Sequence, residues 1–161
     1  MARKDMDKAK FYGLLLESLH KELHLAVNAS QDAADYATND ESRADYQWDT
    51  QGLEASYLAA GQAGMAKKWA DAIKELQSER ESILQSKEQV ELGALFECAY
   101  GEGFDYFFFA RVAGGHEVLI DSQAVTVVSP QSPLAHCLLG LRVGDGFVLP
   151  NGKFSRLLSV E

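Results

Sequence analysis

Acidic side chains crowd one short stretch of this chain. Seven acids lie between residues 32 and 54, against a single base, Arg43. They are Asp32, Asp35, Asp40, Glu41, Asp45, Asp49 and Glu54. Carboxylate oxygens are ligands that Mg²⁺ prefers, and if this stretch is helical, Glu41 with Asp45, or Asp45 with Asp49, share one face at a spacing of four residues. The alternative is a solvated loop whose acids, such as Asp40, cap a helix.

The elements that would present these acids form a helical hairpin. From Lys4 to about Ser86 there is no proline, and Ala, Leu, Glu, Gln and Lys dominate, which favours helix. Apolar and small residues recur at alternating spacings of four and three, the seam of a coiled coil. They are Tyr12, Leu16, Leu19, Leu23, Ala26, Ser30, Ala33 and Ala37, then Leu58, Gln62, Met65, Trp69, Ala72 and Leu76. Small side chains meet small ones only if the helices run antiparallel, so we expect an antiparallel coiled-coil hairpin over residues 1–86 with its acidic tip near 38–52.

The rest of the chain has the pattern of a sheet. β-branched and aromatic residues alternate in short runs that are separated by Gly, Pro and Asn. The runs cover residues 90–100, 104–112, 117–120, 124–128, 146–149 and 154–160. Pro150-Asn151-Gly152 predicts a hairpin turn between the last two. With one helix over residues 133–139, this indicates an α+β fold, whose C-terminal domain at 90–161 holds an antiparallel sheet of about five strands.

The run from Ser132 to Asp145 reads SPLAHCLLGLRVGD and contains a helix with both ends marked. Ser132 is a good N-cap, and Pro133 suits the first helical position, where its missing N–H is not needed. Gly140 supplies a left-handed stop. The side chains that should face the sheet are Leu134, Leu138 and Leu141.

Composition limits the classes of function. The formal net charge of −9 argues against a broad nucleic-acid-binding surface, because phosphate contacts need clustered Lys and Arg. The expected partner is therefore a protein. Neither a signal segment nor a membrane-spanning apolar run occurs, which predicts a cytoplasmic chain without membrane contact. Cys98 and Cys137 lack the short spacing of a zinc or redox motif, so we expect reduced thiols and no metal site of the chain's own.

The Ser132–Asp145 run resembles the signature of the C-terminal domain of the bacterial Gre-family transcript cleavage factors, in which SPLA.ALLG..VGD.V precedes the last hairpin. The layout of the chain, an antiparallel coiled coil with an acidic tip followed by such a domain, is also similar to a Gre factor. This resemblance implies an FKBP-like domain, similar to FK506-binding proteins, that docks at the rim of the RNA polymerase secondary channel. It implies polymerase-binding roles for Ser132, Pro133, Leu134, Gly140 and Asp145.

The resemblance also implies that the coiled coil enters the channel, where its tip comes near the nascent RNA. Family acids there help to hold the second Mg²⁺ of the polymerase beside the water that cleaves backtracked RNA. The corresponding candidates are Asp40, Glu41, Asp45 and Asp49. Such a chain would be a monomeric transcription elongation factor with no cofactor of its own, and not itself an enzyme. Prolyl isomerase activity would rest on fold analogy alone.

The tip departs from the family pattern, however. Gre cleavage factors carry a motif close to D-x-x-E-N-A-E-Y, and matching A-E-Y to Ala44-Asp45-Tyr46 puts Asn39 and Ser42 where the two acids belong. Neither side chain is an anionic Mg²⁺ ligand. The sequence thus resembles a divergent Gre-like branch and leaves two functions open: stimulation of cleavage by shifted acids, or non-cleaving regulation or inhibition from within the channel.

Overall fold

The chain divides into two compact units, each described here by itself. The computed structural model describes residues 6–38 and 50–161, with side chains for all of these except residues 33–38, 50–60 and 62. One unit comprises Met1–Leu16 with Glu75–Glu161, and the other comprises Glu17–Lys74. The sequence pattern instead predicts a domain boundary between residues 86 and 90. That boundary concerns which parts of the chain fold independently, and it stays a prediction.

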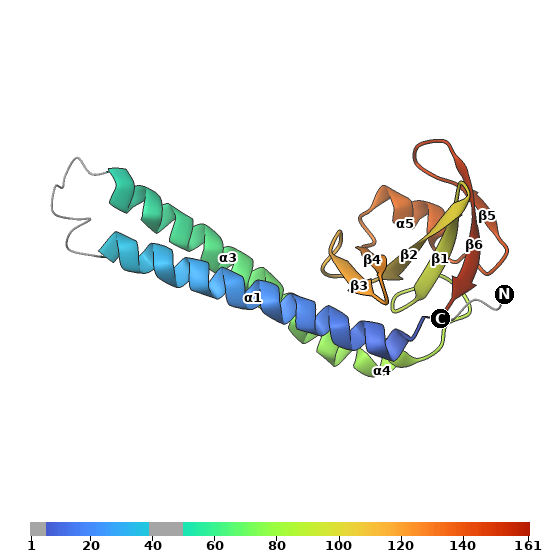
Figure 1. The fold of residues 1–161 in the computed structure, drawn as a ribbon, viewed down its shortest axis with the longest axis horizontal. Helices are drawn as coiled ribbons and strands as arrows, with labels where there is room; N and C mark the ends of the chain where they lie inside the picture. The colour runs from blue at the N-terminus through green and yellow to red at the C-terminus, as the bar shows by residue number, and fades with distance from the viewer. Residues whose placement is uncertain (1–5, 39–49) are drawn as a thin grey trace. The chain divides into compact units, whose positions relative to one another are not determined.

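The N-terminal half is helical, as predicted. Helix α1 covers Lys8–Thr38, α3 covers Thr50–Ser78, and the short α4 covers Arg80–Leu84 (Figure 1). The N–H of Lys10 donates to Oδ1 of Asp7 at 3.1 Å, so Asp7 caps the start of α1. The last residue of α1 and the first residue of α3 lie within the predicted tip range of 38–52.

The seam between α1 and α3 matches the expected heptads only in part. Leu19, Ala26 and Ala72 are buried, but Met65 is 39% exposed, and Ile73 is buried although it lies one residue off the predicted seam. The expectation for Met65 is therefore wrong. An α-helix with 3.6 residues per turn drifts out of a strict seven-residue repeat, and this moves the buried stripe by a residue along the chain.

The C-terminal part confirms an α+β fold with one helix on a sheet, but the sheet is mixed rather than purely antiparallel. Six strands lie in the order β3-β4-β2-β1-β6-β5. They are β1 Leu95–Tyr100, β2 Gly103–Phe109, β3 Glu117–Ile120, β4 Gln123–Val128, β5 Gly146–Val148 and β6 Phe154–Val160. All neighbours pair antiparallel except β2 and β4, which are parallel. Period-2 patterning identifies strands but not the direction of their neighbours, so the sequence could not show this pair.

Both faces of the sheet carry buried side chains. Helix α5, Pro133–Leu138, covers one face, where Leu138 is fully buried and Leu134 and Leu141 pack against the same core, as predicted. The opposite face carries Phe108, whose ring lies 5.0 Å from that of Phe11 in α1. The first residues of the hairpin therefore complete the core of this unit.

Three polar contacts fix the start of α1 and the end of α3 within the same unit. The hydroxyl of Tyr12 donates to the carbonyl of Leu76 at 3.0 Å. Lys10 pairs with Asp121 in the β3–β4 turn, and Arg111 pairs with Glu79, with N–O distances of 3.0 and 3.3 Å. Both ion pairs are exposed and contribute little stability, so they specify position more than they hold the unit together.

Lys8 is a buried cation at this junction. Its side chain is only 7% exposed, and its ammonium donates to the carbonyls of Gln85 and Gly93 at 2.6 and 3.0 Å. Burial, together with the nearby charge of Lys87, lowers the pKa of Lys8 to about 8. Lys8 thus ties the first turn of α1 to the segment between α4 and β1.

No helix within residues 6–38 and 50–161 combines the length and the apolar character needed to cross a bilayer.

Candidate functional site

The predicted catalytic acids Asp40, Glu41, Asp45 and Asp49 lie outside the described residues, as do Asn39 and Ser42. Their proposed role stays a prediction. The described part of the candidate site is therefore the Ser132–Asp145 segment and the cavity beside it.

The Ser132–Asp145 segment folds as its sequence predicts. Oγ of Ser132 accepts a hydrogen bond from the N–H of Leu134 at 3.2 Å, and Pro133 occupies the first turn of α5. Gly140 has a φ of 83°, the left-handed conformation that ends a helix without steric cost in glycine. Its N–H donates to the carbonyl of Val90 at 2.8 Å, which ties the helix end to the segment before β1.

Asp145 closes the turn that follows the helix. Its carboxylate accepts from the N–H of Arg142 at 2.8 Å, while its own N–H donates to the carbonyl of Arg142 at 3.0 Å. The N–H of Gly144 and the carbonyl of Asp145 both bond to Leu157 in β6. The side chains of Ser132 and Asp145 therefore serve the local fold, and their role in polymerase binding stays a prediction.

The apolar surface of this segment comes from residues that sequence reasoning passed over. Leu139 and Val143 are 64% and 59% exposed, and Pro133 is exposed as well. A signal for Leu139 was available: successive helical residues point about 100° apart, so with Leu138 aimed at the sheet, Leu139 at the end of the helix points toward another side. Of the five predicted polymerase-binding residues, Leu134 is partly buried beneath this surface.

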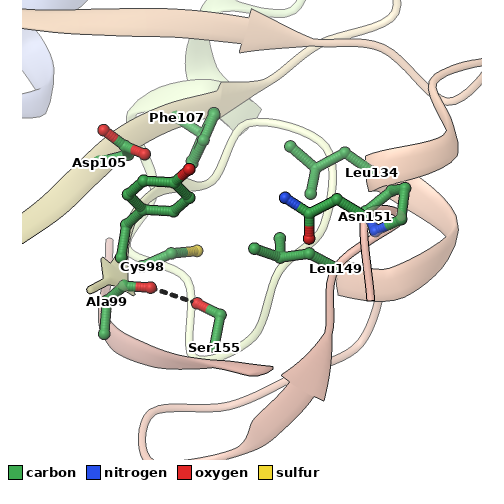
Figure 2. A pocket seen from close by; sticks show the side chains of 10 residues that line it. Cys98, Ala99, Asp105, Phe107, Leu134, Leu149, Asn151 and Ser155 are labelled. Atoms are coloured by element: carbon green, nitrogen blue, oxygen red, sulfur yellow. Dashed lines mark hydrogen bonds between the residues drawn. The ribbon is translucent and has the colours of Figure 1, made fainter. Parts of the chain in front are cut away.

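A cavity of about 300 Å³ opens between β1, β2, α5 and the β5–β6 turn. Figure 2 shows Asp105 and Ala99 on one side of it and Leu134 and Asn151 on the other. Its full lining is Cys98, Ala99, Tyr100, Asp105, Phe107, Leu134, Leu149, Pro150, Asn151 and Ser155. The walls are mostly apolar and aromatic, which is typical of ligand and peptide pockets.

The thiol of Cys98 points into this cavity (Figure 2) but is a poor nucleophile. Burial, together with the charges of Asp105 and Glu97, raises the pKa of Cys98 to about 12. A thiol with so high a pKa is protonated at neutral pH, and the thiolate is the reactive form. The hydroxyl of Ser155 donates to the carbonyl of Ala99, so it is also engaged.

Neither cysteine is in a disulfide, in line with the expected reduced thiols. In the part of the chain that the structure describes, no group of three or more His, Cys, Asp or Glu side chains is placed to hold a metal ion.

No protein-family profile matches the chain, and no curated protein sequence matches it significantly. Among solved structures, it is similar to GreA factor homolog 1 (Gfh1) of Thermus thermophilus, at 25% identity over 91% of this chain and 94% of that one, with a TM-score of 0.37. It is also similar to Thermus aquaticus Gfh1, at 24% identity, 90% and 92% coverage and a TM-score of 0.37. A further structure of the transcription factor Gfh1 gives 24% identity, 100% and 99% coverage and a TM-score of 0.38. With TM-scores this low, the similarity by itself decides neither fold nor function.

Proposed function

We propose that this chain is a transcription factor that binds RNA polymerase at the secondary channel through its C-terminal domain and inserts the acidic hairpin tip. The observation that carries the proposal is the Ser132–Asp145 segment, whose Gre-like signature coincides with a capped helix, a left-handed glycine and a closed turn. At each position of the signature that has a role in the local fold, the residue present can fill that role.

The helices are long enough for a tip to act at a distance from the docking domain. Helix α1 has 31 residues and α3 has 29. At about 1.5 Å of rise per residue, each is about 45 Å long. A hairpin of this length can carry carboxylates to a site that the sheet domain does not reach.

In the first form of the proposal, tip acids help to hold an Mg²⁺ ion of the polymerase and stimulate cleavage of backtracked RNA. The metal ion and the reaction belong to the polymerase, so the chain needs no cofactor and has no reaction of its own. Carboxylates supplied from outside can complete a site in which the ion keeps several waters.

The second form, a non-cleaving regulator or inhibitor of the polymerase, is favoured by one specific observation. Asn39 and Ser42 occupy the positions of the two family acids. A tip with neutral side chains at those positions could still block the channel by its bulk, while lacking the charge that holds the metal ion.

The test is incubation of the full chain with stalled, backtracked polymerase complexes, followed by sizing of the RNA. If the tip completes the Mg²⁺ site, Glu41→Gln or Asp45→Asn should reduce cleavage by about ten- to hundredfold, because the amide keeps the shape but loses the charge. Polymerase affinity should stay nearly constant.

Asp32→Asn is the matched control, because Asp32 is an exposed acid within α1 that should not reach the active centre. Its cleavage rate should equal that of the unaltered chain. A chain that binds backtracked polymerase but shortens no RNA supports the regulator instead. Absence of any polymerase binding would rule out both forms.

A further inference from the structure

We infer that a polar cavity on the face of the sheet away from α5 binds an aliphatic diamine, one of whose ammonium groups lies against the carboxylate of Glu97. The proposed function gives this cavity no role, and the inference does not depend on polymerase binding.

Three polar side chains form a row across the middle of the sheet. Glu97 in β1 lies directly opposite Tyr106 in β2 and Ser159 in β6. Its neighbours Phe96 and Cys98 belong to the core beneath α5. Because successive side chains of a strand point to opposite faces, and directly paired residues share a face, this row lies on the face away from α5.

A cavity of about 430 Å³ opens over this row. Besides the row, its lining includes the hydroxyl of Ser86, the carboxylate of Glu161 and the apolar side chains of Met6 and Leu158. Both charged residues among the described part of the lining are acids, so the cavity favours cations and disfavours phosphates and carboxylates. Its volume is sufficient for a short alkyl chain with an amino group at each end.

Glu97 is the strongest anchor for a cation in this cavity. Its side chain is only 1% exposed, and the attraction between a carboxylate and a cation increases as water is excluded. The ring of Tyr106 lies beside it and is held by an edge-to-face contact with Phe104, with centroids 5.5 Å apart at 86°. An aromatic ring next to a carboxylate adds a cation–π attraction.

The hydrogen-bonding groups favour a primary ammonium over other cations. Serine hydroxyls and carboxylate oxygens accept hydrogen bonds, and a primary ammonium supplies three donors whereas a quaternary one supplies none. Within the described residues no group of three or more His, Cys, Asp or Glu is placed to hold a metal ion, which disfavours a divalent metal as the guest.

The second ammonium of a diamine has a weaker anchor in Glu161. Burial lowers the pKa of Lys8, and the charge of Glu161 opposes this shift, so Glu161 is already attracted to Lys8. Lys8 lines a neighbouring cavity that shares Met6, Ser86 and Glu161 with this one. Most of the affinity should therefore come from the ammonium at Glu97.

The test is titration of the full chain, labelled with ¹⁵N, with butane-1,4-diamine at about pH 7, where both amino groups are protonated. Amide shifts should concentrate at residues 86, 97, 106 and 158–161. Butane-1,4-diol has the same length without charge and should produce no saturable shifts. The diamine with both nitrogens fully methylated should bind about fivefold more weakly or worse, because it keeps the charge but loses every N–H donor.

Glu97→Gln keeps the shape of the side chain but removes its charge, and should weaken diamine binding by about tenfold or more. Tyr106→Leu, which keeps Glu97 and removes the ring, should weaken it by about two- to fivefold. Glu102→Gln is the control, because Glu102 is an exposed acid of the β1–β2 turn that does not line the cavity.

A dispersed amide spectrum shows whether each variant is folded. Equal binding of the diol, shifts spread over the surface, or unchanged affinity in folded Glu97→Gln would each overturn the inference. If Glu97→Gln does not fold, unchanged affinity in Tyr106→Leu overturns it instead. Polymerase is absent from this experiment, so its outcome is separate from that of the proposed function.

Discussion

The residues that carry the Gre-like signature have two different physical jobs. Ser132, Gly140 and Asp145 form the cap, the helix stop and the turn, so their identity is required by the local backbone. Leu139 and Val143 have no such role and expose apolar surface. Under the proposed function, the first group shapes the docking surface and the second group presents it.

Replacing the N-cap of α5 tests this division. Ser132→Ala removes the acceptor for the N–H of Leu134 and should lower the free energy of unfolding by about 1 kcal/mol. The measurement is urea denaturation of the full chain, with Gln131→Ala as a control at an exposed neighbour. Ser132→Asp should restore stability, since Asp is also a good N-cap. If Ser132→Ala behaves like the control, the cap does not stabilise α5.

Lys8 makes a prediction about pH. Its ordinary pKa is 10.5, and in the folded chain burial lowers it to about 8, so between these values the unfolded chain binds a proton that the folded chain has released. The free energy of unfolding should therefore rise with pH through this window, relative to a variant without the group. Below about pH 8 both states are charged and the difference should be flat.

The measurement for Lys8 compares denaturation of the unaltered chain with that of Lys8→Met at about pH 7, 8.5 and 10. Methionine keeps most of the side-chain length but has neither charge nor donor. Glu91 and Glu161 raise the pKa, opposing burial and Lys87, so they should not be altered in this comparison. Parallel pH profiles for the two proteins would show that Lys8 is not perturbed.

At the scale of elements, the hairpin depends on a few buried positions. Leu19 is fully buried in α1, whereas Leu25, six residues later on the same helix, is 53% exposed. Leu19→Ala should lower the free energy of unfolding by about 2 to 4 kcal/mol, through lost burial and a residual cavity. Leu25→Ala should change it by less than about 0.5 kcal/mol. Thermal unfolding followed by helical circular dichroism gives both values, and equal losses would contradict the buried seam.

The sheet shows which elements a sequence can predict. The Pro150-Asn151-Gly152 turn was found because local residue chemistry decides it. The β3–β4 turn is harder to predict from the sequence. Asp121 and Ser122 both adopt a positive φ, 48° and 67°, at positions where glycine or asparagine is usual. The parallel pairing of β2 with β4 has no local signal at all, since it depends on the path of the chain.

At the scale of the whole molecule, sequence patterning divides the chain where helix gives way to sheet. The two compact units of the structure divide it at other positions. Met1–Leu16 and Glu75–Glu161 form one unit, in which Phe11 packs on Phe108. The three consecutive aromatics at 107–109 require one ring to face away from α5, and that ring needs a cover. The sequence shows the need for this cover, but it does not show that the first residues of α1 provide it.

This arrangement predicts how the chain can be shortened. Joining Leu16 to Glu75 through about five Gly and Ser residues removes the unit Glu17–Lys74 but keeps the cover over Phe108. Tyr12 already bonds to Leu76, so a short linker can span the neighbouring helices, which pack at about 8–10 Å. The shortened chain should stay folded, as judged by dispersed amide spectra, bind core RNA polymerase nearly as well as the full chain, and shorten no RNA in backtracked complexes.

The fragment 90–161 is the matched comparison. It lacks Phe11, Leu76 and Lys8, so it should unfold at lower urea concentration than the linked chain, because Phe108 and its buried neighbours become exposed to water. Equal stability of the two would show that the first turns of the hairpin contribute nothing to the sheet domain, and that the boundary predicted between residues 86 and 90 is the physical one.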